Sequence, residues 1–288
     1  MRRFSRSIRQ RLFAALLVLA LAGAAPAPGQ NPWEHLPVTP ALPQPERSGT
    51  APVNGIRLWY AVFGHGSPVI LLHGGLANSN YWGLQIPALA PHFEVIVMDS
   101  RGHGRSTWDG RPISYHLMAS DVLALMDALH IPKAAMVGWS DGAIIGLDIA
   151  VLHPERLTKL FAFGANSNLS GVKSGEGSST FTAYPRRTRE EHKQLSPMPS
   201  QFDAFYQQLN KMWDTEPDFS DAQLRSIKVP TWIVDGDHDE IIKRQDTDRM
   251  ANLIPGAREV ILPRTSHFAF LQDPKQFNDA LLHFLSSN

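Results

Sequence analysis

The fold of this chain is decided by the stretch Gly138-Trp139-Ser140-Asp141-Gly142. It follows the apolar run Ala134–Val137 directly and leads into a helical pattern over Gly142–Leu152. A serine on a sharp strand-to-helix turn crowds its neighbours two positions away on either side, so small side chains are needed there. The start of the helix also turns backbone N–H groups and a partial positive charge toward the serine. This context predicts that Ser140 is a nucleophile on a strained turn.

Short apolar runs and longer amphipathic stretches alternate on both sides of this turn. The predicted strands are Ile56–Phe63, Val69–Leu72, Val95–Met98, Ala134–Val137, Leu157–Phe163, Thr231–Val234 and Val260–Leu262. The predicted helices are Tyr115–His130, Gly142–Leu152, Arg244–Leu253 and Pro274–Phe284. Near-continuous apolar strands that alternate with helices are typical of a mostly parallel sheet covered on both faces. The sequence therefore predicts an α/β fold.

Two polar loops follow predicted strands later in the chain, in the order acid and then histidine. The first loop carries Asp235, Asp237 and Asp239 after the strand Thr231–Val234. The carboxyl ends of parallel strands are where such sheets place their ligands. We favour Asp239, three residues after Gly236, as the acid that orients a histidine. Asp235 and Asp237 remain competitors, and some of these acids are expected only to make turns.

The second loop contains His267, which follows the strand Val260–Leu262 and precedes the last predicted helix. The chain has 12 histidines, so most of them must be structural or exposed. His238 abuts the acid loop but precedes Asp239, which is the wrong order for a general base. The pattern therefore predicts His267 as the base that takes the proton of Ser140.

From Thr50 to the C-terminus the chain resembles the α/β-hydrolase superfamily. The resemblance rests on the elbow around Ser140 and on the loop Asp99–Ser106, which matches the superfamily pattern D-x-R-G-x-G-x-S. The elbow, with Gly164-Ala165-Asn166 after the next strand, is similar to the valacyclovir hydrolase (biphenyl hydrolase-like) branch. That branch commonly has two glycines where this chain has Gly142-Ala143. The resemblance implies an α/β-hydrolase fold, with a mostly parallel eight-stranded sheet flanked by helices and a small cap insertion.

The same resemblance implies a serine hydrolase that cleaves carboxylic esters of small molecules through an acyl-enzyme. The oxyanion would be held by the backbone N–H groups of Asp141 and of Gly75 or Leu76, and no metal or organic cofactor is needed. Asp141 matches the acid that holds the α-amino group of amino-acid esters in this branch, so the resemblance implies a preference for amino-acid or other cationic esters. Trp139, beside it, is a further candidate for substrate binding. The alternative for Asp141 is that it caps the helix or binds an arginine.

Other classes of enzyme use the same serine, acid and histidine. A lactonase, an aminopeptidase and a carbon–carbon bond hydrolase therefore remain alternative functions. Epoxide hydrolases and haloalkane dehalogenases are disfavoured, because they place an aspartate where Ser140 stands. A non-catalytic binding protein on the same fold tends to lose a member of the triad, whereas Ser140, Asp239 and His267 are all present.

The N-terminus predicts export. Five arginines precede the apolar run Leu12–Leu21, and small residues follow over 22–27, which is the pattern of a secretory signal peptide. We predict a signal over residues 1–24, cleaved after Ala24, and a periplasmic or secreted protein. The alternative is an uncleaved anchor, although the apolar run is shorter than the roughly 20 residues that a spanning helix needs. Residues 25–49 are rich in proline and are expected to form a linker or a strap over the surface.

The remaining residues, 50–288, are predicted to form one hydrolase domain with a cap at about 166–228. This cap contains one amphipathic helix, Gln201–Trp213, and its alternative is a disordered loop. The chain has 27 basic and 27 acidic residues, which does not favour nucleic acid as a partner. It has no cysteine, which excludes disulfides and thiolate metal sites. The predicted partner is a small-molecule ester, with no stable membrane insertion after signal cleavage, and no pattern predicts an oligomeric state.

Overall fold

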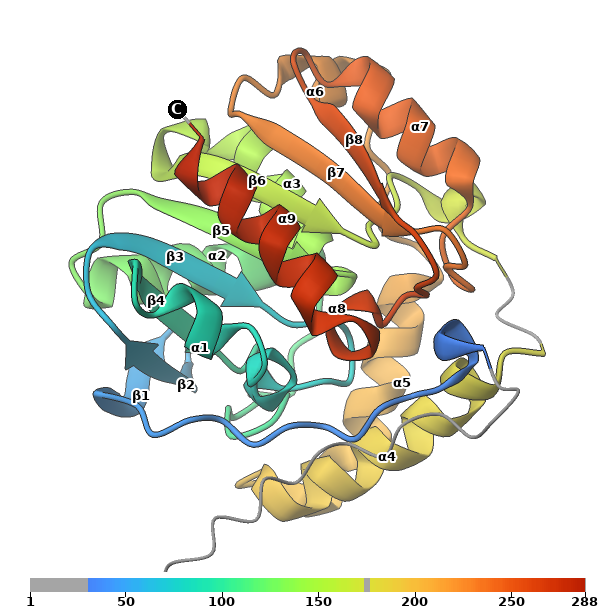
Figure 1. The fold of residues 1–288 in the computed structure, drawn as a ribbon. Helices are drawn as coiled ribbons and strands as arrows, with labels where there is room; N and C mark the ends of the chain where they lie inside the picture. The colour runs from blue at the N-terminus through green and yellow to red at the C-terminus, as the bar shows by residue number, and fades with distance from the viewer. Residues whose placement is uncertain (1–30, 174–176, 288) are drawn as a thin grey trace, which may run out of the picture.

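Eight strands form a single sheet in the computed structural model, which describes residues 31–173 and 177–287 (Figure 1). Along the sheet the order is β1-β2-β4-β3-β5-β6-β7-β8. The strands are β1 Arg47–Val53, β2 Ile56–Phe63, β3 Ser67–Leu72, β4 Phe93–Met98, β5 Ala134–Trp139, β6 Leu157–Phe163, β7 Thr231–Gly236 and β8 Arg258–Leu262. β2 pairs antiparallel with β1 and β4, and every other pair is parallel. The predicted mostly parallel, eight-stranded α/β sheet is confirmed.

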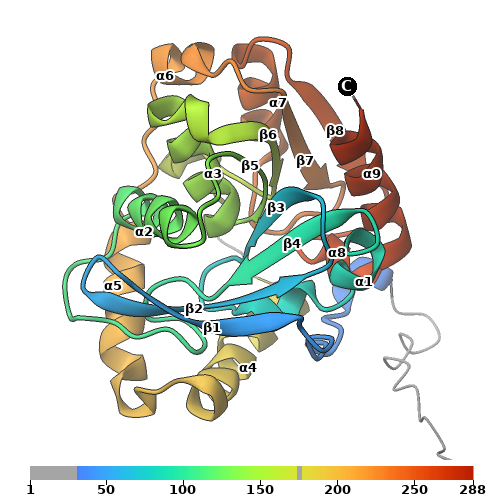
Figure 2. The same cartoon turned by 90° about the vertical axis from the view of Figure 1, so that its left-hand side faces the viewer.

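Helices cover both faces of this sheet, as Figure 2 shows, with α2 and α3 on one side and α1 and α9 on the other. The α-helices are α1 Ile86–Leu89, α2 Tyr115–Ala128, α3 Asp141–Leu152, α4 Ser179–Leu195, α5 Phe202–Trp213, α6 Asp221–Ser226, α7 Arg244–Leu253, α8 Ala269–Gln272 and α9 Pro274–Ser286. The core fills the space between the layers. On the α9 side, for example, the fully buried rings of Phe161 and Phe277 lie 5.6 Å apart.

The segment between β6 and β7 carries α4 and α5, which stand together at one end of the sheet (Figure 1). We keep the name cap for residues 166–228 of this segment. α5 lies where the amphipathic pattern predicted a helix, whereas α4 was not predicted. The serines that make this stretch resemble a loop start the helix instead, because the side chain of Ser178 accepts a hydrogen bond from the Phe181 amide.

An extended N-terminal strap, which we define as residues 31–46, crosses the surface between the cap and α8 (Figure 1). Gln272 of α8 donates to the carbonyl of His35 at 2.9 Å, and Thr39 donates to Glu191 of α4 at 2.5 Å. β1 begins at Arg47, three residues before the predicted boundary at Thr50, because residues 47–50 pair with residues 59–62 of β2. Proline-rich composition gave no indication of that pairing.

The predicted signal peptide, residues 1–24, lies outside the described residues and stays a prediction. No helix within residues 31–173 or 177–287 is both long enough and apolar enough to cross a bilayer.

Candidate active site

Ser140 lies on a strained turn between β5 and α3. Its backbone has φ 54° and ψ −121°, a conformation that residues other than glycine rarely adopt. Glycine is required on both sides for steric reasons. A Cβ atom at Gly138 would lie 2.3 Å from the carbonyl oxygen of Gly142, and one at Gly142 would lie 2.2 Å from that of Leu72. The turn therefore has the strained geometry expected from the sequence.

His267 and Asp239 form a buried hydrogen-bonded pair. The Nδ1 atom of His267 lies 2.6 Å from Oδ2 of Asp239, and both side chains are almost fully buried. The other oxygen of Asp239 accepts from the amides of Ile241 and Ile242, both at 2.7 Å. The carboxylate is thus held by the loop after β7. An ionised Asp239 requires the proton on Nδ1, which leaves Nε2 of the neutral ring as the proton acceptor.

The other two acids of this loop have structural partners. Asp235 accepts from the Gly236 amide and from the Thr247 hydroxyl, both at 2.9 Å. Asp237 accepts from the Thr265 amide at 3.1 Å. Neither bonds to the imidazole of His267, so the structure brings Asp239, and not its two competitors, to the histidine.

Each member of this pair shifts the pKa of the other. Burial alone would raise the pKa of Asp239, but the charge and hydrogen bond of His267 outweigh it and lower the pKa to about 2. Burial alone would lower the pKa of His267, but the charge and hydrogen bond of Asp239 raise it above its ordinary value. Asp239 is therefore ionised at neutral pH, and it stabilises the imidazolium form of His267.

Ser140 and His267 line one cavity of about 480 Å³. The sheet side of the cavity includes Gly75, Leu76 and Asp141, and the cap contributes Tyr184 and Trp213. Within the described residues, no hydrogen bond joins the Ser140 hydroxyl to His267. Such bonds are often long in ligand-free enzymes and shorten when substrate binds.

The two predicted oxyanion segments border the cavity. The first segment is Asp141, the first residue of α3. The second is the turn that contains Gly75 and Leu76, which the Ala77 amide closes by donating to the Gly74 carbonyl at 3.2 Å. In the part of the chain that the structure describes, the amides of Gly75, Leu76 and Asp141 donate to no protein acceptor. All three amides of the predicted set are therefore available, and Gly75 and Leu76 remain alternatives for the second donor.

Asp141 is buried beside the cavity and is held by two side chains. Its Oδ1 atom accepts from the Tyr115 hydroxyl at 2.8 Å, and its Oδ2 atom accepts from the Trp213 indole at 3.1 Å. Burial raises the pKa of Asp141 to about 6, although both hydrogen bonds oppose that shift. Among the described residues, no arginine is hydrogen-bonded or ion-paired with this carboxylate. The structure therefore does not support the alternative that Asp141 binds an arginine.

Trp139 also lines the cavity, but it is packed tightly, with 1% of its surface exposed. Its ring centroid lies 4.7 Å from that of Phe270 and 5.9 Å from that of His267. Trp139 therefore supports the histidine from the side, and its role in substrate binding stays a prediction.

Several residues at the site had no prediction from the sequence. Tyr115 and Trp213 bond to Asp141, Tyr184 donates to the Gly75 carbonyl at 2.6 Å, and Glu240 accepts from the His267 amide at 3.0 Å. Of these, Trp213 lies in the amphipathic helix that the sequence predicted, Gln201–Trp213. The others make contacts between distant parts of the chain that no local pattern records.

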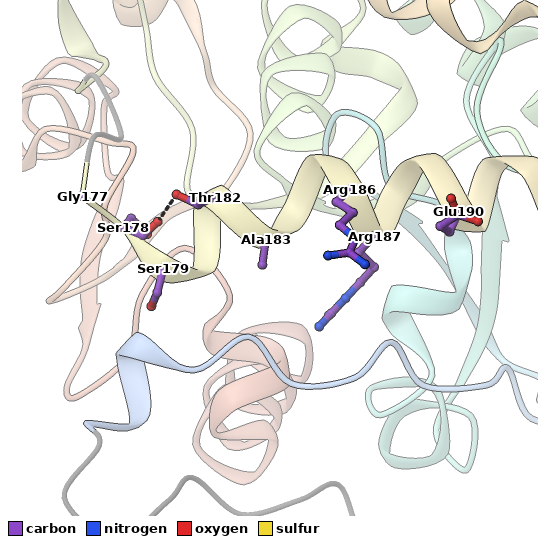
Figure 3. Close-up of a pocket in the computed structure, with 8 residues that line it drawn as sticks. All are labelled: Gly177, Ser178, Ser179, Thr182, Ala183, Arg186, Arg187 and Glu190. Atoms are coloured by element: carbon purple, nitrogen blue, oxygen red, sulfur yellow. Dashed lines mark hydrogen bonds between the residues drawn. The ribbon is translucent and has the colours of Figure 1, made fainter.

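A second hollow lies along α4, and Figure 3 labels the residues that line it. Its lining residues all come from Gly177–Glu190, and Arg187 among them donates to the strap carbonyl of Leu36 at 3.0 Å. None of the predicted site residues borders it. We therefore assign the candidate active site to the cavity that Ser140 and His267 share.

Comparisons with known proteins agree with this geometry. Residues 67–196 match the family model described as alpha/beta hydrolase fold. The human serine hydrolase BPHL is 28% identical over 254 residues, which cover 83% of this chain and 86% of that protein. A putative carbamate hydrolase, RutD of Pseudomonas savastanoi pv. phaseolicola, is 28% identical over 252 residues, covering 77% and 95%.

Among solved structures, Est816, described as an N-acyl homoserine lactone degrading enzyme, superimposes with a TM-score of 0.68 at 26% identity. The alignment covers 82% of this chain and all of that one. Fold, site geometry and relatives agree: the chain has the α/β-hydrolase fold, it is a hydrolase, and it is similar to the valacyclovir hydrolase (biphenyl hydrolase-like) branch.

Proposed function

We propose that this hydrolase cleaves carboxylic esters of small molecules, with Ser140 as nucleophile, His267 as general base and Asp239 as the residue that orients His267. The observation that carries the proposal is the buried pair of His267 and Asp239, 2.6 Å apart, whose histidine lines the same cavity as Ser140. A serine on a strained elbow and an imidazole held by a carboxylate are the parts that acyl transfer requires.

The reaction then has two steps. The Ser140 oxygen attacks the ester carbonyl carbon and gives its proton to Nε2 of His267, while the amides of Asp141 and of Gly75 or Leu76 hold the oxyanion. The carbon–oxygen bond to the alcohol breaks, and the alcohol leaves with the proton from His267. Water, deprotonated by His267, next attacks the acyl-enzyme, and the carboxylic acid is released as Ser140 regains its proton.

A fluorophosphonate probe tests the nucleophile. It reacts covalently with an activated serine, so wild-type protein should be labelled at Ser140, with the site identified by mass spectrometry. Ser140→Ala should lose the label and the ester hydrolysis, while its thermal unfolding stays close to that of the wild type. Folded wild-type protein without label would contradict the proposal.

We further propose that the preferred esters carry an amine. Three carboxylates line the cavity, those of Asp141, Asp214 and Glu216, whereas no lysine or arginine is among its lining residues. Asp141 directly follows the nucleophile, so its charge lies close to the acyl group of a bound ester. An ammonium group there would be attracted to a carboxylate in a partly desolvated site, where charged hydrogen bonds contribute about 1.5–3 kcal/mol.

The matched substrates for this test are an amino-acid p-nitrophenyl ester and its N-acetylated form, which differ only in the charge on the amine. Asp141→Asn removes the negative charge but keeps an oxygen for Tyr115. We expect kcat/KM for the charged ester to fall about 10- to 100-fold, by the energy of one charged hydrogen bond. The N-acetylated ester should lose much less. Equal losses on both esters would show that Asp141 does not bind the amine.

Lactone hydrolysis is a second candidate reaction, because a lactone is a cyclic ester that the same residues would open. The similarity to Est816, at 26% identity, favours it over the remaining alternatives. A pH-stat assay with acyl homoserine lactones and with the amino-acid esters would rank the two. If kcat/KM is higher for the lactones, the lactone and not the amino-acid ester is the preferred substrate.

A further inference from the structure

The turn at Gly74–Ala77 has an unusual conformation for its sequence. The Ala77 amide donates to the Gly74 carbonyl at 3.2 Å, so Gly75 and Leu76 are the two central residues of a four-residue turn. Leu76 has φ 63°, while Gly75 is not among the residues with positive φ. This combination is the type II arrangement, whose third position strongly favours glycine. A leucine there prefers the type I turn, in which the central peptide is flipped.

One cap residue bonds to that central peptide. The hydroxyl of Tyr184, in α4, donates to the Gly75 carbonyl at 2.6 Å. The Tyr184 ring is buried, and its centroid lies 6.0 Å from that of Trp139 and 5.2 Å from that of Phe268. Those two residues directly precede Ser140 and directly follow His267. The tyrosine is thus fixed between the neighbours of both proposed catalytic residues.

A second cap residue closes over the same turn. A Cβ atom at Gly75 would lie 2.5 Å from the Trp213 ring and 2.6 Å from the Asp141 carboxylate, so the indole packs directly on the Gly75 backbone. Trp213 belongs to α5 and Tyr184 to α4. Two helices of the cap, α4 and α5, therefore contact the backbone of one turn, and that turn carries the amides of Gly75 and Leu76.

We propose that Tyr184 is a positioning residue for the oxyanion site, and that it couples the seating of the cap to the formation of that site. Its hydroxyl holds the Gly75 carbonyl and so keeps the central peptide in the type II orientation that leucine alone would not favour. The directions of the adjacent amides follow from that orientation, since each peptide unit is planar. The inference rests on the proposed acyl-transfer function, in which one of these amides stabilises the oxyanion.

Tyr184→Phe tests the proposal, because it removes the hydroxyl and keeps the ring. Loss of a whole oxyanion donor costs about 10²–10³ in rate, so a misplaced donor should lower kcat roughly 10-fold, with KM changed less than about twofold. The matched control is Tyr81→Phe. Tyr81 is also buried between the sheet domain and the cap, and its ring also packs on Trp139, but its hydroxyl faces Glu191.

Two inhibitors separate positioning from packing. A trifluoromethyl ketone forms a tetrahedral anion with the serine, whereas the product carboxylic acid binds without forming that adduct. We expect Tyr184→Phe to lower the affinity for the ketone by the same factor by which it lowers kcat/KM. The affinity for the acid should be unchanged. A rise in KM alone, equal losses on both inhibitors, or the same losses in Tyr81→Phe would overturn the proposal and make Tyr184 a packing residue.

Hydrogen exchange gives a readout that needs no activity. In Tyr184→Phe, the Ala77 amide, whose hydrogen bond to the Gly74 carbonyl closes the turn, should exchange faster than in wild type and in Tyr81→Phe. Unchanged exchange there would overturn the proposal. Absence of fluorophosphonate labelling in the wild type would instead refute the proposed function, so the two failures are distinguishable.

Discussion

Asp141 carries a negative charge in a place that disfavours it. Burial raises its pKa to about 6 from the ordinary value of 3.8, in spite of the hydrogen bonds from Tyr115 and Trp213. A shift of about two pKa units corresponds to roughly 3 kcal/mol of unfavourable free energy for the ionised form. A residue kept at such a cost to stability is typical of a functional site.

The pH dependence of stability should reveal this cost. Because the pKa of Asp141 is raised on folding, the native state holds the proton more tightly, so Asp141 lowers stability progressively as the pH rises from about 4 to about 6. At pH 8 we expect Asp141→Asn to have a higher Tm than wild type. The corresponding gain in the free energy of unfolding is up to about 3 kcal/mol. The difference should shrink toward pH 4. Thermal unfolding at both pH values measures it, and a lower Tm for the variant at pH 8 would contradict the interpretation.

As the proposed general base, His267 should set the pH dependence of the reaction. A general base acts in its neutral form, and Asp239 raises the pKa of His267 above the ordinary value of 6.5. The kcat/KM for a neutral ester should therefore rise with pH and level off above a midpoint higher than 6.5.

Asp239→Asn removes the charge that causes this shift, so the midpoint should move down and kcat should fall by about 10³–10⁴. The pH profiles of both proteins measure it. Asp237→Asn is the control, because Asp237 bonds to the Thr265 amide and not to the imidazole. A similar loss in both variants would mean that Asp239 has no special role.

The element that presents Ser140 depends on the close approach of β5, α3 and the end of β3. At Gly142 an added Cβ would meet the Leu72 backbone at 2.2 Å, and backbone cannot rotate away as a side chain can. Gly146 is in the same helix, but a Cβ there would meet only the Leu160 side chain, at 2.6 Å.

The two glycines should therefore respond differently to alanine. We expect Gly142→Ala to lower the free energy of unfolding by about 3 kcal/mol or to make the protein insoluble, because overpacking against rigid backbone is destabilising. Gly146→Ala should stay within about 1 kcal/mol of wild type, because alanine also favours the helix. Chemical denaturation measures both, and equal effects would show that the elbow tolerates a side chain.

Elements were predictable where a local pattern determined them. The limits of β2, β6 and α7 follow apolar periodicity and flanking breakers, and the structure has the same limits. β1 was missed because its pairing with β2, rather than its own proline-containing sequence, makes it a strand. α4 was missed because its serine-rich start and internal Pro185 are typical of a loop.

The site follows the same rule. Ser140 directly follows β5, and Asp239 and His267 lie in the loops that follow β7 and β8, so their placement at one edge of the sheet was predictable. Tyr115, Tyr184 and Glu240 reach the site through contacts with residues 26, 109 and 27 positions away in sequence. Their roles depend on how the cap and the loops pack, which one sequence without its fold does not specify.

At the scale of the whole molecule, the cavity is built from two parts with different constraints. The sheet domain contributes Ser140, Asp141 and His267 from loops whose backbones are tightly packed. The cap contributes the opposite wall from the side chains of α4 and α5. The two parts therefore meet across one cavity, where Tyr184 and Trp213 of the cap bond to Gly75 and Asp141.

The N-terminal strap limits how those two parts can move. A rigid body joined at two points can still rotate about the line between them, and the cap is joined covalently to the sheet domain at its two ends. The strap adds a third attachment, through Thr39 to Glu191 on the cap and through His35 to Gln272 on α8. A third point away from that line removes the rotation. Any movement of the cap away from the sheet would therefore have to break these hydrogen bonds or carry the strap with it.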